Sequence, residues 1–207
     1  MQDHRTQLAT LIASRICHDL ISPVGAISNG LELVSLGGGM SDGPEMSLIS
    51  ESCDNANARI RFFRVAFGTA NDMAQVSALE TRSILDAMTR GTRLQIVWPS
   101  DGDASRTDVQ LAFLAIQCAE VALRRGGRID ISLAPNRVEI QASADTISID
   151  PILWRHLDGP QATTRVLGEA LDIAPAHVQF ALLPLLAGDR ARKPSYQATE
   201  SDLTIVV

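Results

Sequence analysis

The sequence is poor in cysteine. Its 207 residues include only three, Cys17, Cys53 and Cys118, an odd number at no spacing typical of a metal site. Each lies in an apolar stretch with helical periodicity, so we expect all three to be thiols of the core. A disulfide framework and a cysteine-ligated metal are therefore not indicated.

Basic clusters, aromatic residues and long apolar runs are also scarce. The formal charge of -6, the 4% of aromatic residues and the absence of a Lys/Arg cluster argue against a nucleic-acid surface. No apolar run approaches the ~20 residues that span a bilayer, and no early segment has the pattern of a signal peptide. We therefore expect a cytoplasmic protein without direct membrane contact, with enough apolar residues (45%) for a buried core.

The first third of the chain has the periodicity of two helices. Apolar residues from Gln7 to about Leu36 recur at spacings of three, four and seven, which predicts one long amphipathic helix. The stretch "LGGGMSDGPE" interrupts it and offers Ser41 or Asp42 as the cap of a second helix. That helix has alternating spacings of three and four, typical of an a/d seam, at Met46, Ile49, Cys53, Ala56, Ile60, Phe63 and Phe67.

Two such helices joined by a short turn form an antiparallel hairpin, here residues 1–72. A lone hairpin cannot enclose its own apolar stripe. We therefore expect a homodimer, in which two hairpins form a four-helix bundle across a two-fold axis.

Residues 76–207 have the pattern of an α/β domain. Helices are predicted for "SALETRSILDAMTRG", capped by Ser77 and Glu80, and for "TDVQLAFLAIQCAEVALRRGG", with shorter ones at "PILWRHL" and "PAHVQFALLPLLAG". "RLQIVW" and "DLTIVV" alternate as strands do, and "RIDISLA" and "RVEIQAS" predict a β-hairpin around Pro135 and Asn136. The predicted fold class is α+β: a helical hairpin, then a sandwich with helices on one face of a mixed sheet. Trp98 and Trp154 are expected in its core.

One histidine of the first helix lies away from the apolar stripe. At 100° per residue His18 faces solvent, and most of its neighbours in projection are small or polar. We assign to this docking face Ser14, Arg15, Ser22, Gly25, Asn29 and Glu32. An exposed imidazole can attack a phosphoryl group through one ring nitrogen while Asp19 orients the ring or accepts the other proton. Periodicity alone also fits a histidine that is simply solvated.

A resemblance adds to this reading. "HDLISPVGAISNGLELV" resembles the phosphoacceptor box of sensor histidine kinases, in which a proline follows the histidine by five residues. The longer "CHDLISPVGAISNGLELV" is similar to the ChpT-type histidine phosphotransferases of α-proteobacteria. The order of hairpin and α/β domain extends the similarity over most of the chain.

The resemblance implies a phosphorelay intermediate. His18 would accept a phosphoryl group from the receiver domain of a hybrid histidine kinase and pass it to the aspartate of a response regulator, with Asp19 as its acidic neighbour. The Mg²⁺ of this chemistry would lie on the receiver, and no bound cofactor is expected here.

The α/β domain departs from that of an ATP-dependent histidine kinase. Cys118 stands where such a kinase has its Mg²⁺-binding asparagine, and the segment after "RVEIQAS" has Asp145 and Asp150 but no glycine before Gly159. Because the adenine-binding turn and the glycine-rich lid are also missing, we expect a degenerate ATPase-like domain that binds no nucleotide.

Two other readings stay open. The chain could be a non-catalytic dimeric adaptor that only binds response regulators, or a kinase with a hidden nucleotide site. A metal-dependent phosphohydrolase is disfavoured, since His4, His156 and His177 do not have ligand spacing relative to His18.

Overall fold

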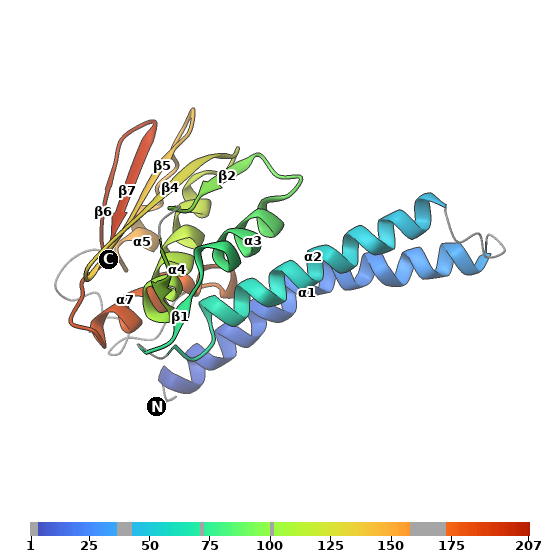
Figure 1. The fold of residues 1–207 in the computed structure, drawn as a ribbon, viewed down its shortest axis with the longest axis horizontal. Coiled ribbons are helices and arrows are strands. Elements are labelled where there is room, and N and C mark those ends of the chain that lie inside the picture. Colours follow the sequence, from blue (N-terminus) through green and yellow to red (C-terminus); the bar gives the residue numbers. More distant parts are fainter. Residues whose placement is uncertain (1–3, 37–42, 71–72, 100–101, 158–172) are drawn as a thin grey trace.

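The computed structural model describes residues 4–36, 43–70, 73–99, 102–157 and 173–207 (Figure 1). Two long helices, α1 (His4–Leu36) and α2 (Pro44–Ala66), form the predicted hairpin and project from the rest of the molecule. Gly43 is the N-cap of α2 and Pro44 its first residue, so the prediction of a Ser41 or Asp42 cap was wrong. A proline has its φ already set for the first helical position. Ser41, Asp42 and most of the glycine turn lie outside the described residues.

The α/β part contains a five-stranded mixed sheet and helices on one face of it (Figure 1). The helices are α3 (Ala78–Thr89), α4 (Arg106–Ala122), α5 (Pro151–Trp154), the 3₁₀ turn η1 (Pro175–His177) and α7 (Gln179–Gly188). Ser77 caps α3 by accepting from the Glu80 N–H, which confirms Ser77 as the cap. An α+β chain with N-terminal helices and a mixed sheet is thus confirmed.

The sheet has the order β2-β4-β5-β7-β6. Its strands are β2 (Leu94–Val97), β4 (Gly127–Ala134), β5 (Arg137–Ser143), β6 (Ser195–Ala198) and β7 (Asp202–Val206). Only β2 and β4 are parallel, and β4 and β5 form the expected hairpin. Buried residues alternate along β5 and β7, because one face of the sheet lies on α4 and the other faces solvent.

Three short strands were not predicted. β6 lies at the edge of the sheet and is mostly exposed, while β1 (Gln75–Val76) pairs with β3 (Ala104–Ser105) beside α4. Two-residue strands carry no periodicity, and an exposed edge strand such as β6 need not alternate. Pattern analysis therefore has little to detect in these segments.

The hairpin and the α/β part share one hydrophobic core. Phe62 of α2 stacks on Phe113 of α4 with ring centroids 4.7 Å apart, and Trp98 meets Phe113 edge-on. Phe62, Phe113 and Trp98 are all buried, as is Trp154. The base of the hairpin is thus packed into the α/β part, while its far half projects beyond it.

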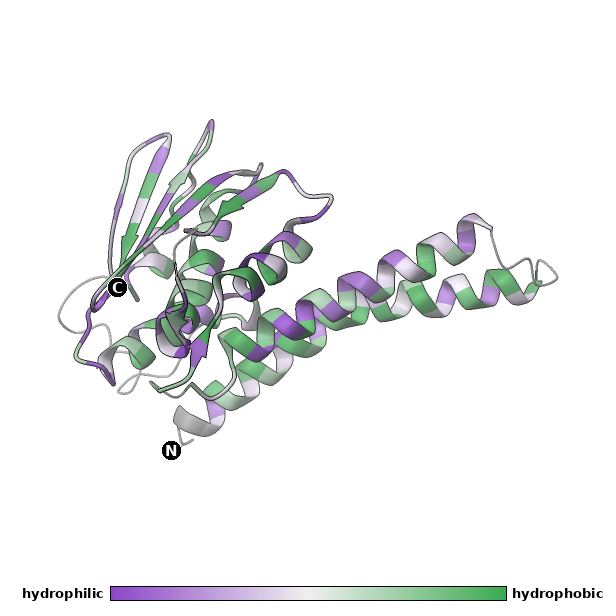
Figure 2. Cartoon of the chain, viewed as in Figure 1, coloured by the Kyte–Doolittle hydropathy of each residue, from purple (hydrophilic) through white to green (hydrophobic). Residues whose placement is uncertain are grey.

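The hairpin carries apolar side chains that stay exposed in the described part of the chain, and Figure 2 shows hydrophobic residues continuing along both helices. Ile60, a predicted seam residue, is 50% exposed, and Leu31 of the first apolar stripe is 52% exposed. Cys17 is also exposed, which corrects its prediction as a core thiol; Cys53 is half-buried and Cys118 buried. Cys17 directly precedes His18, and both residues are exposed. No helix in the described part of the chain is both long enough and apolar enough to cross a membrane.

Candidate functional site

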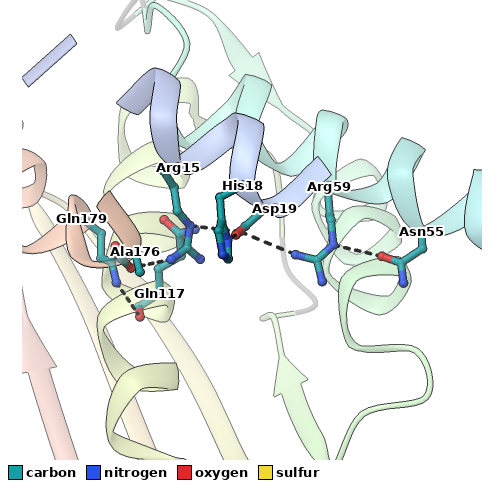
Figure 3. Close-up of polar contacts among 8 residues, drawn as sticks. All are labelled: Arg15, His18, Asp19, Asn55, Arg59, Gln117, Ala176 and Gln179. Atoms are coloured by element: carbon teal, nitrogen blue, oxygen red, sulfur yellow. Dashed lines mark hydrogen bonds and ion pairs between the residues drawn. The ribbon is translucent and has the colours of Figure 1, made fainter. Parts of the chain in front are cut away.

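His18 lies on α1 at an exposed position, near residues of α4 and η1 of the α/β part (Figure 3). Its side chain is 82% exposed, whereas that of the adjacent Asp19 is only 10% exposed. Asp19 Oδ1 lies 3.2 Å from His18 Nδ1. A neutral imidazole that donates from Nδ1 to this carboxylate presents the lone pair of Nε2 to solvent, which is the state that a nucleophile needs.

Two arginines hold the carboxylate of Asp19 (Figure 3). Arg15 Nε lies 3.0 Å from Oδ2, one helical turn back on α1, and Arg59 Nη1 of α2 lies 3.6 Å from the same oxygen. Arg59 Nε in turn donates to Asn55 Oδ1 at 3.1 Å, which ties the guanidinium to its own helix. The ring of His18 is therefore oriented by a carboxylate that is itself fixed from both helices of the hairpin.

The same set of side chains reaches the α/β part. Arg15 donates to the backbone carbonyl of Ala176 in η1, and Gln179 donates to the backbone carbonyl of Gln117 in α4 at 3.4 Å. Burial, and next the positive charge of Arg15, lower the pKa of the neighbouring His177. The first contact ties the base of α1 to η1 and the second ties α7 to α4, so the position of His18 depends on both parts of the fold.

Glu120, near the end of α4, belongs to this electrostatic environment. Burial is the main reason that its pKa rises to about 7, while Arg15 and Arg59 act to lower it and Asp19 to raise it. The half-buried Glu120 therefore changes its charge near neutral pH, within range of the residues that hold Asp19.

The predicted docking residues fall into two groups. Most are exposed on the same side of α1 as His18: Ser14, Ser22, Gly25, Asn29 and Glu32. A β-carbon added at Gly25 would meet no atom within 4 Å, so packing inside the chain does not require a glycine there. Arg15, in contrast, is 18% exposed and engaged with Asp19 and Ala176, so a docking role for it stays a prediction.

A groove of about 220 Å³ runs between the two helices beside His18. It begins one turn after the histidine and is lined by Ser22, Pro23, Ala26, Leu48, Glu51, Ser52, Asn55 and Arg59. Sequence analysis missed Asn55 and Arg59; their spacing of four on α2 is the signal that could have identified them as a polar pair. Among the described residues, no three His, Cys, Asp or Glu side chains form a cluster that could hold a metal ion.

Comparison with known proteins identifies the family. The model of the histidine phosphotransferase C-terminal domain matches residues 78–202. The chain belongs to this family. It is also 37% identical over 202 residues to the protein phosphotransferase ChpT of Brucella abortus (strain 2308), covering 95% of this chain and 92% of the relative.

One solved structure agrees with this assignment. A bacterial phosphotransferase of 29% identity superimposes with a TM-score of 0.75 over 97% of this chain and 95% of the other. The histidine kinase AdeS of Acinetobacter baumannii, 10% identical, gives a TM-score of 0.40 over 92% and 96% of the two chains. This histidine phosphotransferase therefore takes part in a phosphorelay. Such a role fits a chain whose segment around His18 resembles a phosphoacceptor box while its α/β part lacks the residue pattern of a kinase.

Proposed function

We propose that His18 is the phosphoacceptor of this histidine phosphotransferase, and that Asp19 positions its ring. The main support for this proposal is the exposed imidazole of His18, whose Nδ1 lies against the carboxylate of Asp19, which is itself held by Arg15 and Arg59. Nε2 attacks the phosphorus of a receiver's aspartyl phosphate, the N–P bond forms, and the P–O bond to the aspartate breaks with its electron pair left on the carboxylate. Asp19 stabilises the positive charge that the phosphorylated ring acquires while Nδ1 keeps its proton.

The donor in this proposal is the receiver domain of a hybrid histidine kinase, and the acceptors are response regulators, all in the cytoplasm. The groove between α1 and α2 and the exposed residues around His18 offer a surface on which such a domain can dock. Transfer between two proteins requires in-line placement of the phosphorus and Nε2 rather than covalent help from other side chains, and the Mg²⁺ stays with the receiver.

We also propose that the chain acts without ATP. Cys118, at the position where a kinase has its metal-binding asparagine, is completely buried in α4 and faces the core. Burial raises the pKa of its thiol well above the ordinary value, so the thiolate that would bind a metal is disfavoured. Gly159 and the region that follows it to residue 172 lie outside the described residues.

A homodimer is the third part of the proposal. The large apolar side chains left exposed on the described part of the hairpin are Ile21, Val24, Leu31, Leu33, Leu36, Met46, Leu48 and Ile60. Burying those that lie on the apolar stripe of α1, such as Leu31, against a second hairpin would give the four-helix bundle expected from the sequence.

The decisive experiment offers a ³²P-labelled receiver domain, or labelled ATP alone, to wild type and to His18→Ala. Acid-labile, base-stable label on wild type from the receiver only is the expected result. Label on His18→Ala would contradict His18 as acceptor, and label from ATP would reveal a nucleotide site. If neither source labels the wild type across several receivers, the result favours the hypothesis of a non-catalytic adaptor that only binds response regulators.

A further inference from the structure

A second cavity, of about 420 Å³, lies at the C-terminal end of α4. It is bounded by the end of α3, the start of β2 and the turn that follows α4, with the lining residues Met88, Thr89, Thr92, Arg93, Leu94, Glu120, Leu123, Arg124, Arg125 and Gly126. The three arginines come from two separate turns. Their convergence is a product of the tertiary fold.

These arginines are exposed, and no carboxylate of the described residues lies within 4.0 Å of any of the three guanidinium groups. Other surface arginines form ion pairs within the chain, such as Arg128 with Asp130 and Arg137 with Glu139. In a chain of net charge -6, three unpaired cations around one hollow form a local field of the opposite sign.

The cavity is close enough to His18 for one partner to touch both. Gln117 of α4 lies near Arg15 in the surroundings of His18 (Figure 3). Glu120, which lines the cavity, interacts electrostatically with Arg15, Arg59 and Asp19. Glu120 follows Gln117 by three residues of α4, about 4.5 Å at the rise of a helix, and Arg124 comes two residues after the end of that helix. A domain of some 120 residues has a diameter of roughly 30 Å and can span this separation.

We propose that this cavity is a second contact for the partner that reacts at His18, and that its three arginines bind a carboxylate-rich patch on the surface of the receiver domain. The inference rests on the proposed function, because it concerns the same partner. Guanidinium groups pair with carboxylates in a planar, bidentate geometry, and exposed charges of this kind act mainly on encounter and orientation. Glu120 is the one carboxylate in the lining, and its raised pKa reduces its repulsion of an acidic partner at neutral pH.

The test compares two charge reversals of equal size. Arg124→Glu changes the cavity, and Lys193→Glu changes an exposed residue just before β6, at the opposite edge of the sheet from β2. For each variant, KM and kcat for phosphoryl transfer from the receiver are measured at about 50 and 300 mM salt, and the Kd of the unphosphorylated receiver is measured by calorimetry. A denaturation midpoint checks folding.

We expect Arg124→Glu to raise KM and Kd about tenfold at low salt, with kcat unchanged and a smaller effect at high salt because screening weakens the interaction. Lys193→Glu should stay within twofold of wild type. Equal KM and Kd values for the two variants would overturn the inference while leaving His18 as acceptor. The calorimetric Kd decides the question even if His18 itself fails the labelling experiment.

A small anion is the competing occupant. Wild type and Arg124→Glu are therefore also titrated with inorganic pyrophosphate. Binding of pyrophosphate that is lost in Arg124→Glu, with no change in the receiver's Kd, would overturn the receiver as the occupant of this cavity.

Discussion

Asp19 Oδ1 lies 3.2 Å from His18 Nδ1, and the two side chains differ sharply in exposure, 10% against 82%. Adjacent residues on a helix point about 100° apart, so one side chain can be buried against its neighbours while the other stays in solvent. The acid is buried where arginines from both helices can hold it, and the nucleophile is left where another protein can reach it.

Asp19→Asn keeps the shape of the side chain but removes the charge that stabilises the phosphorylated ring. We expect the single-turnover rate of transfer to His18 to fall about 10²-fold, the lower end of what a positioned acid–base group supplies. Rapid-quench measurement with a phosphorylated receiver gives this rate. Arg59→Gln, which removes one of the two arginines, should cause a smaller loss in the same assay. A rate for Asp19→Asn equal to wild type would refute the positioning role.

Gly25→Ala should separate stability from partner binding. A β-carbon at Gly25 meets nothing within 4 Å, and alanine is favoured over glycine inside a helix, so the free energy of unfolding should rise by about 0.5–1 kcal/mol. If a receiver approaches this face closely, KM for transfer should rise several-fold. Gly30→Ala is the contrasting variant, because its β-carbon would lie 2.5 Å from Ile49 Cγ1 and should destabilise the hairpin. A Gly25→Ala variant with an unchanged KM would place the docking surface elsewhere.

Glu120 predicts a pH dependence of stability. Its pKa of about 7 in the folded chain exceeds the ordinary value of 4.5, so the folded state binds this proton more tightly than the unfolded state. The resulting stabilisation is complete below about pH 4.5 and is lost as the pH rises through 7. Glu120→Gln should remove this decline, on the order of 1–3 kcal/mol between pH 5 and pH 8.

Urea denaturation of wild type and Glu120→Gln at both pH values measures the effect. The lowered pKa of His177 makes the fold more stable as the pH rises through this range. Because His177 is present in both proteins, its contribution cancels in the difference between their free energies of unfolding. Parallel pH profiles for the two proteins would show that Glu120 titrates normally.

Leu31→Glu tests the homodimer. Leu31 is 52% exposed on the apolar stripe of α1, and a charge there would have to be buried between two hairpins. Sedimentation equilibrium should show a dimer for wild type and a shift of at least tenfold toward monomer for the variant. Leu79→Glu, at a position 73% exposed on α3, should remain dimeric. A monomeric wild type would rule out the bundle.

Phe62→Ala tests whether the hairpin and the α/β part unfold together. Phe62 stacks on Phe113 inside the shared core, and truncation of such a residue costs about 3–5 kcal/mol. The fluorescence of Trp98 and Trp154 reports on the α/β core, and far-ultraviolet dichroism reports largely on the long helices. Both transitions should move together. Leu79→Ala, at an exposed position, should leave both midpoints within about 0.5 kcal/mol of wild type. Separate shifts of the two signals would indicate two independent units.

The local features of the chain could be predicted because they depend on near neighbours in the sequence. Helical periodicity determined the hairpin and the outward direction of His18, alternation determined the β4–β5 pair, and Ser77 marked the start of α3. The acceptor box and its family resemblance likewise lie within one continuous segment.

Only the tertiary structure decided which distant groups surround the acceptor. Arg59 reaches Asp19 from another helix, Arg15 is drawn to η1, and three arginines of two separate turns meet in one cavity. These contacts depend on how α1, α2 and α4 pack around Phe62 and Phe113, a relation that no spacing along the chain encodes. The exposure of Cys17 has the same origin, since a residue with apolar neighbours in sequence is buried only if another element covers its side of the helix.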